Sequence, residues 1–207
     1  MDKGKVLDKA KFLYKAVWAG IFNSIAATLF LMSEDRIVGS FLFTFGLFCV
    51  AVTQSNLFTG MAGYFPQRKW WELVLAFTGN IIGCILYGLA YALSGHHEKI
   101  YEKVYQVCEF KFQSGLLSIF LMSALCGALV FLGVDTFKKH RDIVGVVVAF
   151  FCIGGFVICG FEQVVANMAY LSLAQYPVGI AEFGKLLLMG LGNMTGAVAL
   201  RKMKELQ

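Results

Sequence analysis

The sequence predicts an all-α membrane protein with six transmembrane helices, arranged as an inverted repeat of three helices and three helices. Hydrophobic residues make up 58% of the 207-residue chain and charged residues only 15%, against about 25% charged residues in a typical soluble domain. The apolar residues gather in six long runs, and polar residues interrupt the second and the fifth of them. A soluble fold could not bury so much apolar surface, so we expect lipid to surround the protein.

The six runs have lengths that suit membrane helices. Four of them have 21–24 residues, close to the roughly 20 residues of helix that cross a bilayer. The second has 29 residues and the fifth has 34, which is too long for one straight span and too short for two. The runs are Phe12–Met32, Ile37–Phe65, Trp70–Leu93, Ser114–Val134, Ile143–Tyr176 and Val178–Leu200.

We expect one transmembrane domain over residues 1–207. Its predicted parts are a cytoplasmic segment (1–11), a first repeat (12–93), an external loop (94–113), a second repeat (114–200) and a cytoplasmic tail (201–207). Residues 1–11 are polar, and the apolar run that follows is longer than the core of a signal peptide, which has about 7–15 residues. The first run is therefore expected to stay in the protein as its first membrane helix.

Polar residues lie partway along the second and the fifth runs. They are Thr53 to Asn56 in the second run, and Gly160 to Gln163 with Asn167 in the fifth. Backbone groups without partners are costly in lipid, so a broken helix is tolerated only where it lines a cavity or is buried in protein. We expect two discontinuous helices that meet near the middle of the membrane.

The third and the sixth runs share a short motif. The pattern G-N-x-x-G occurs at residues 79–83 and again at residues 192–196. On its own this pattern is typical of a close helix-packing face. Its place in both halves indicates a duplicated architecture, and three helices per half give the halves opposite orientations. Interrupted segments at corresponding positions of such a repeat point to a transport site.

The basic residues predict the orientation. The net charge is +5, but the Lys and Arg residues cluster in short loops and near the chain ends, so a nucleic-acid partner is not expected. Four lie on the predicted external side (Arg36, Lys99, Lys103, Lys111), and Lys185 lies near the start of the sixth run. The other thirteen are Lys3, Lys5, Lys9, Lys11, Lys15, Arg68, Lys69, Lys138, Lys139, Arg141, Arg201, Lys202 and Lys204. Because cytoplasmic loops carry the excess of basic residues, we expect a multi-pass protein of the plasma (inner) membrane with both termini in the cytoplasm.

At its two interruptions the sequence resembles the formate/nitrite transporter family. Residues 54–60 read Q-S-N-L-F-T-G, and Leu57, Phe58 and Thr59 match the L-F-T signature loop of that family. Residues 160–168 read G-F-E-Q-V-V-A-N-M and resemble the signature G-F-E-H-x-x-A-N-M. The resemblance covers nearly the whole chain and the second signature is long, so family membership is our prediction.

The resemblance implies an aquaporin-like fold with one pore in each protomer of a homopentamer. It implies two apolar constrictions around a small central chamber. Leu47, twelve residues before Thr59, and Phe156, seven residues before Gln163, match the constriction residues. The same resemblance implies that Thr59, Gln163 and Asn167 face the chamber. Without it, Leu47 and Phe156 would be read as ordinary core or lipid-facing residues.

Two departures from the family pattern bear on the chemistry. Gln163 replaces the central histidine, and Gly145 stands where we expected the family lysine, fifteen residues before Gly160. Gln163 cannot titrate, so we expect the pore to take protons from bulk water. A missing lysine would weaken the attraction of anions into the vestibule, which makes a neutral permeant more plausible.

Glu162 is the one acidic residue deep in an apolar run. Intramembrane carboxylates are often functional, and a proton relay is one reading. The reading we favour is support of the helix break, with the carboxylate accepting hydrogen bonds from freed backbone N–H groups. His96-His97-Glu98 has no partner ligands at zinc-like spacing, so no metal is expected there. No cofactor is expected either.

The predicted function is a channel or transporter for small monovalent anions or their conjugate weak acids, of the formate, nitrite, hydrosulfide, acetate or lactate class. Its partners would be that substrate, membrane lipid and further copies of the chain. Two alternatives stay open: a pore for small neutral solutes, and a membrane scaffold or sensor that transports nothing. An enzyme is not expected, because a membrane enzyme would need a catalytic set within the membrane, and no HExxH, GxSxG or paired acids appear in the apolar runs.

Overall fold

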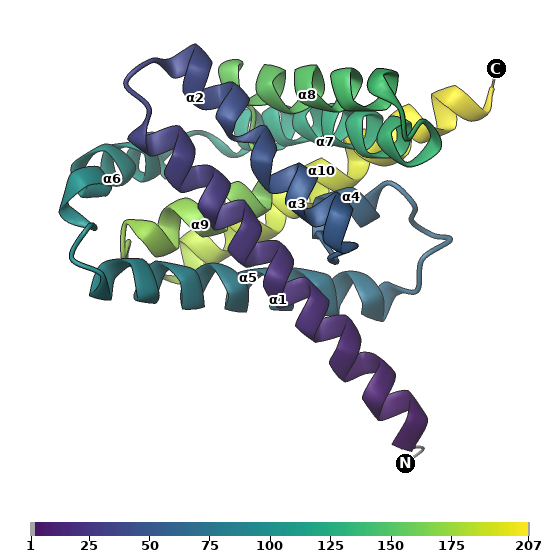
Figure 1. Cartoon of the computed structure of the whole chain (residues 1–207), viewed down its shortest axis with the longest axis horizontal. Helices are drawn as coiled ribbons and strands as arrows, with labels where there is room; N and C mark the ends of the chain where they lie inside the picture. The colour runs from purple at the N-terminus through teal and green to yellow at the C-terminus, as the bar shows by residue number, and fades with distance from the viewer. Residues whose placement is uncertain (1–2, 207) are drawn as a thin grey trace.

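The computed structural model describes residues 3–206, and this part of the chain forms ten α-helices and no strand (Figure 1). The prediction of an all-α fold is confirmed. The helices are α1 (Lys3–Met32), α2 (Arg36–Leu42), α3 (Thr44–Thr53), α4 (Phe58–Ala62), α5 (Trp70–Leu93), α6 (Glu98–Gln113), α7 (Leu116–Lys139), α8 (Ile143–Ile158), α9 (Val164–Leu173) and α10 (Ile180–Glu205).

The long helices pack as two equivalent pairs. Helix α1 lies along α5 in the first half of the chain, and α7 lies along α10 in the second half. The short helices then cross between the halves, since α9 packs against α5 and α4 packs against α10. In Figure 1 α5 lies below, α7 and α8 lie above, α9 and α4 lie between them, and α1 runs diagonally across the view from the lower right to the upper left. This exchange is what an inverted repeat of two interlocked halves produces.

The glycines of the repeated motif allow each pair to approach closely. A Cβ atom on Gly79 or Gly83 would overlap residues of α1, including Ala16 and the Val17 carbonyl. On the other pair, Gly192 and Gly196 lie in the same way against Ser123, Phe120 and Ala124 of α7. The prediction of a packing face is therefore confirmed at both copies of the motif.

Within residues 3–206, five helices are long and apolar enough to cross a membrane, counting α2 and α3 as one span. The others are α1, α5, α7 and α10. The fifth predicted run consists of two shorter apolar helices, α8 and α9, joined by the expected break. The protein is thus a multi-pass integral membrane protein with the second and the fifth segments interrupted.

Two details differ from the prediction. A bend at Phe43 divides α2 from α3. Because this residue is neither glycine nor proline, nothing in the sequence indicates a bend at this position. Residues 94–113, expected as a loop, contain the 16-residue helix α6. Its apolar face is narrow, because only every fourth residue is buried: Ile100, Val104, Cys108 and Phe112. The Lys and Glu residues between them made the segment read as a polar connection.

Candidate functional site

The first helix break lies between α3 and α4 and is held by an asparagine of α5. Helix α3 ends at Gln54, which has a positive φ of 53°. The Phe58 backbone N–H donates to Asn80 Oδ1 at 2.9 Å. Asn80 Nδ2 donates in turn to the carbonyls of Ala16 (2.8 Å) and Asn56 (3.0 Å). One buried amide therefore supplies the partners that the broken backbone has lost.

The second break repeats this arrangement with an asparagine of α10. The turn after α8 passes through Gly160, which has a positive φ of 70°. The Val164 backbone N–H donates to Asn193 Oδ1 at 2.9 Å. Asn193 Nδ2 donates to the carbonyls of Ser123 (2.8 Å) and Glu162 (2.7 Å). The asparagines of the two G-N-x-x-G motifs thus have the same role, which was not predicted from the sequence. The sequence feature that could have revealed this role is an asparagine inside a long apolar run.

Glu162 supports the site in a different way from the one expected. Its carboxylate bonds to no freed backbone N–H, since Asn193 takes that of Val164. Instead Glu162 Oε2 accepts from Asn167 Nδ2 at 2.7 Å and forms an ion pair with Lys111 Nζ at 2.8 Å. Both charged side chains are largely buried. A buried carboxylate needs such a cation, and here it comes from α6.

Gln163 lies at the start of α9, and both the oxygen and the nitrogen of its side-chain amide form hydrogen bonds. Its Oε1 accepts from the Ala166 backbone N–H, which caps the helix, and from Asn23 Nδ2 at 3.4 Å. Its Nε2 donates to Thr59 Oγ1 at 3.2 Å. Asn23, Thr59 and Gln163 are 4%, 1% and 3% exposed. The structure therefore joins α1, α4 and α9 through three uncharged polar side chains in the interior.

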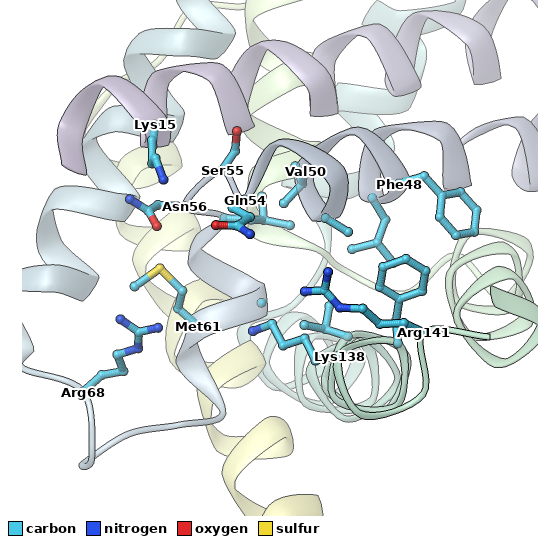
Figure 2. A pocket seen from close by; sticks show the side chains of 16 residues that line it. Lys15, Phe48, Val50, Gln54, Ser55, Asn56, Met61, Arg68, Lys138 and Arg141 are labelled. Carbon is cyan, nitrogen blue, oxygen red and sulfur yellow. The ribbon is translucent and has the colours of Figure 1, made fainter. Parts of the chain in front are cut away.

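One cavity, of 390 Å³, opens at the end of the helices where α3 and α7 finish. Figure 2 shows its lining, with the amides of Gln54 and Asn56 beside the basic side chains. Four cations contribute to the wall: Lys15, Arg68, Lys138 and Arg141. Leu47 and Leu57 also line it. We call it the first cavity.

A second cavity, of 460 Å³, lies at the opposite end, between α6 and the α8–α9 break. Three cations and one acid line it: Arg36, Lys103, Lys111 and Glu34. Phe156, Gln163 and Asn167 form part of its inner wall. Basic side chains therefore outnumber acidic ones in the lining of both cavities.

A buried layer separates the two cavities, since no described residue lines both. Gly60 borders the first cavity and Gln163 the second, and the Thr59–Gln163 hydrogen bond joins α4 to α9 between them. Leu47 and Phe156, both buried, lie on the two sides of this layer. Their role as constrictions stays a prediction.

The expectation attached to Gly145 needs correction. Gly145 lies in the first turn of α8, where its amide donates to Asp142 and a Cβ atom would strike the His140 carbonyl. No lysine fits that place. The cation beside the signature glutamate is Lys111, which forms an ion pair with Glu162. Lys111 was not predicted as a site residue because residues 94–113 were expected to form a loop.

Two other sequence features are structural. His97 Nε2 lies 2.6 Å from the Leu173 carbonyl at the end of α9, which anchors α6 at its start. Lys185 Nζ donates to the Phe112 carbonyl at the end of α6, which ties α10 to α6. Among residues 3–206, no three His, Cys, Asp or Glu side chains gather in a way that could hold a metal ion.

The chain was compared with known proteins. The profile of the family described as Formate/nitrite transporter matches residues 2–204. A "Formate-nitrite transporter" of Plasmodium knowlesi is 27% identical over 83% of this chain and 67% of its own length. The "Formate channel FocA" of Escherichia coli is 25% identical over 76% of this chain and 64% of its own length. The chain thus spans about two thirds of these relatives.

Solved structures show the same fold. An "FNT family ion channel" superposes with a TM-score of 0.87 at 22% identity, over 98% of this chain and 91% of that one. A "Pentameric formate channel with formate bound" superposes with a TM-score of 0.82 at 20% identity, over 96% of both chains. These relatives are transporters and channels and not enzymes. Since the family profile extends over almost every residue, from the first helix to the last, the chain belongs to the formate/nitrite transporter family.

Proposed function

We propose that this chain is a transmembrane channel for small monovalent anions or their conjugate weak acids. The observation that carries the proposal is the pair of cation-lined cavities at opposite ends of the helices, separated by a buried layer of uncharged polar groups. Family membership and the formate channels among its relatives support it.

The cavities have the charge that an anion pathway needs. Lysine and arginine side chains in a concave site with apolar walls raise the local concentration of anions. The first cavity offers four such side chains, and the second offers three, of which Lys111 is paired with Glu162. Electrostatic attraction therefore acts at both mouths, which suits passive movement in either direction.

The buried layer determines the form in which the substrate crosses. Moving a bare ion into a low-dielectric interior costs several kcal/mol or more even after relaxation. The layer offers amide and hydroxyl groups but no titratable side chain on Asn23, Thr59 or Gln163. A weak acid that takes its proton before it enters the layer avoids that cost. Flux should therefore increase as the pH falls toward the pKa of the permeant acid.

The same proposal covers assembly and orientation. The name of a structural neighbour describes a pentameric formate channel, and we propose a homopentamer with one pore in each protomer. The excess of basic residues on the side of the first cavity, which carries Lys15, Arg68, Lys138 and Arg141, supports cytoplasmic termini in a plasma membrane.

Uptake into proteoliposomes tests the function. Formate, nitrite, hydrosulfide, acetate and lactate are each offered over a pH series from 5 to 8, with empty liposomes as the control. The expected result is saturable flux of at least one substrate that increases as the pH falls. A correctly assembled oligomer that passes none of them above the control would refute the proposal.

A pore for small neutral solutes is the second candidate, because Asn23, Thr59 and Gln163 offer uncharged amides and a hydroxyl in the interior. Uptake of urea and glycerol into the same vesicles separates the two. Neutral-solute flux that is independent of pH, without any flux of the acids, would favour this candidate. Silence toward both classes of solute would leave the scaffold or sensor role.

A further inference from the structure

The orientation of the Gln163 amide is fixed by the helix that it caps. The Ala166 backbone N–H needs an acceptor, and only the carbonyl oxygen of the amide can provide one. Gln163 Oε1 must therefore point toward the start of α9. Its Nε2 is then directed to the other side, where it donates to Thr59 Oγ1 at 3.2 Å.

The orientation of the Gln163 amide determines how its hydrogen-bond partners Asn23 and Thr59 are oriented. Asn23 lies 3.4 Å from Oε1, so the atom that faces Gln163 must be its Nδ2. Thr59 accepts a hydrogen bond from Nε2 on its hydroxyl oxygen. A hydroxyl that accepts on its oxygen can still donate its own proton. All the N–H groups in this chain of hydrogen bonds point the same way, from Asn23 to Gln163 to Thr59.

Hydrogen bonds that all point toward Thr59 polarise the hydroxyl at the end of the row. Hydrogen bonds in a row polarise one another, most strongly where the dielectric constant is low. Gln163 lines the second cavity, and Gly60, the neighbour of Thr59 in the chain, lines the first, so the Gln163–Thr59 hydrogen bond lies between the two cavities. There the Thr59 hydroxyl is left as a polarised donor.

We propose that Asn23, Gln163 and Thr59 form a one-way relay of hydrogen bonds that makes the Thr59 hydroxyl a dedicated donor to the substrate. Its ligand is a small molecule with an exposed acceptor oxygen, such as a monovalent oxyanion or the carbonyl of its acid. Asn23 is a positioning residue: it donates to Gln163 and acts on the substrate through it. This inference rests on the proposed function.

Saturation curves for formate uptake test the relay. Asn23→Leu and Asn23→Ala both remove the donor but differ in volume, so a space-filling role and a donor role give different results. The relay predicts that both variants raise the half-saturating formate concentration about two- to threefold, because the hydrogen bond from Thr59 to the substrate remains and loses only the strengthening, roughly 10–30% per bond, that its neighbours provide. The maximal rate and the shape of the pH profile should change little.

Two further variants examine the end of the relay. Thr59→Val removes the hydroxyl and should raise the half-saturating concentration at least as much as either Asn23 variant, while Thr59→Ser should stay near the parent. Adding Asn23→Leu to Thr59→Val should have no further effect, because the relay has already lost its end. Ser24→Ala is the matched control, since the buried Ser24 hydroxyl donates to its own helix at Gly20 and lies outside the relay.

The outcomes separate the relay from the channel proposal. A parent protein that passes no substrate refutes the channel and the relay with it. If the parent conducts, then an unchanged half-saturating concentration in both Asn23 variants overturns the relay alone. So does a shift that is seen in Asn23→Ala but not in Asn23→Leu, or an additive effect in the double variant. Gel filtration of each variant confirms that the oligomer is intact.

Discussion

The asparagines of the two G-N-x-x-G motifs should be the most sensitive positions outside the pore. Replacing Asn193 with alanine removes the acceptor of the Val164 N–H and the donor to the Glu162 carbonyl. Replacing Asn80 removes the acceptor of the Phe58 N–H and the donor to the Asn56 carbonyl. Either change leaves backbone groups at a helix break without a partner.

The magnitude follows from that count. A buried polar group without a partner costs about 1–3 kcal/mol. Two such groups, one N–H and one carbonyl, give a loss of about 2–6 kcal/mol for either Asn193→Ala or Asn80→Ala. For a domain of this size about 1 kcal/mol corresponds to roughly 2–4 °C in Tm. We expect a decrease of about 5–20 °C, similar for the two variants because the breaks are held in the same way.

Thermal unfolding of the purified protein in detergent, followed by tryptophan fluorescence, measures the effect. Thr195→Ala is the control, because Thr195 is exposed on the same helix as Asn193 and its hydroxyl bonds only to the Leu191 carbonyl. That control should unfold within about 2 °C of the parent. If either asparagine variant unfolds at the temperature of the parent, the asparagines are not what holds the breaks, and the reasoning is refuted.

Three further predictions concern the interior of the protein. Gln163→His introduces a group that titrates near pH 6.5, so a new inflection should appear in the pH profile of flux. Superimposable pH profiles of the variant and the parent would show that residue 163 has no part in proton coupling. Lys111→Met leaves the Glu162 carboxylate buried without its cation and should destabilise the protein by about 3–5 kcal/mol, which a lower Tm would show. Adding Glu162→Gln to this variant should restore much of the lost stability. A double variant less stable than Lys111→Met alone would contradict the ion pair. Burial raises the pKa of the Cys108 thiol to about 12, so its reactive thiolate form is scarce at pH 8. A maleimide should therefore label the exposed Cys159 well before the buried Cys108. Equal labelling rates of the two cysteines, measured by mass spectrometry, would contradict the burial of Cys108.

The fold could be predicted from the sequence because lipid imposes strong patterns. Apolar runs of about 20 residues seldom occur outside membrane helices, and a motif repeated at equivalent places reveals the duplication. Helix α6 was not predicted because it lies against the protein with one narrow apolar face, and its Lys and Glu residues are typical of a loop. A search for apolar runs long enough to cross a membrane cannot find such a helix.

The site could be predicted only where a residue type is unusual for its surroundings. Glu162 and Gln163 stand out in an apolar run, and the structure places both at the second break. Asn23 did not stand out, because a single amide in a membrane helix carries no sign of its partner 140 positions away. Lys111 has the same difficulty, since its ion pair with Glu162 is a product of the tertiary fold.

The two breaks show how the chain can carry glutamine at position 163, where the sequence resemblance implies a histidine. Leu57 and Gln163 hold equivalent places, one residue before the N–H that Asn80 or Asn193 accepts, and their backbones agree closely, with φ and ψ of −85° and 124° against −99° and 115°. Leu57 makes no side-chain cap, yet α4 begins there all the same. The asparagines therefore hold the scaffold in both halves, and the side chain at the cap position is free to vary with the chemistry of the pore. A change at Gln163 should alter what crosses the layer while the break beneath it stays intact.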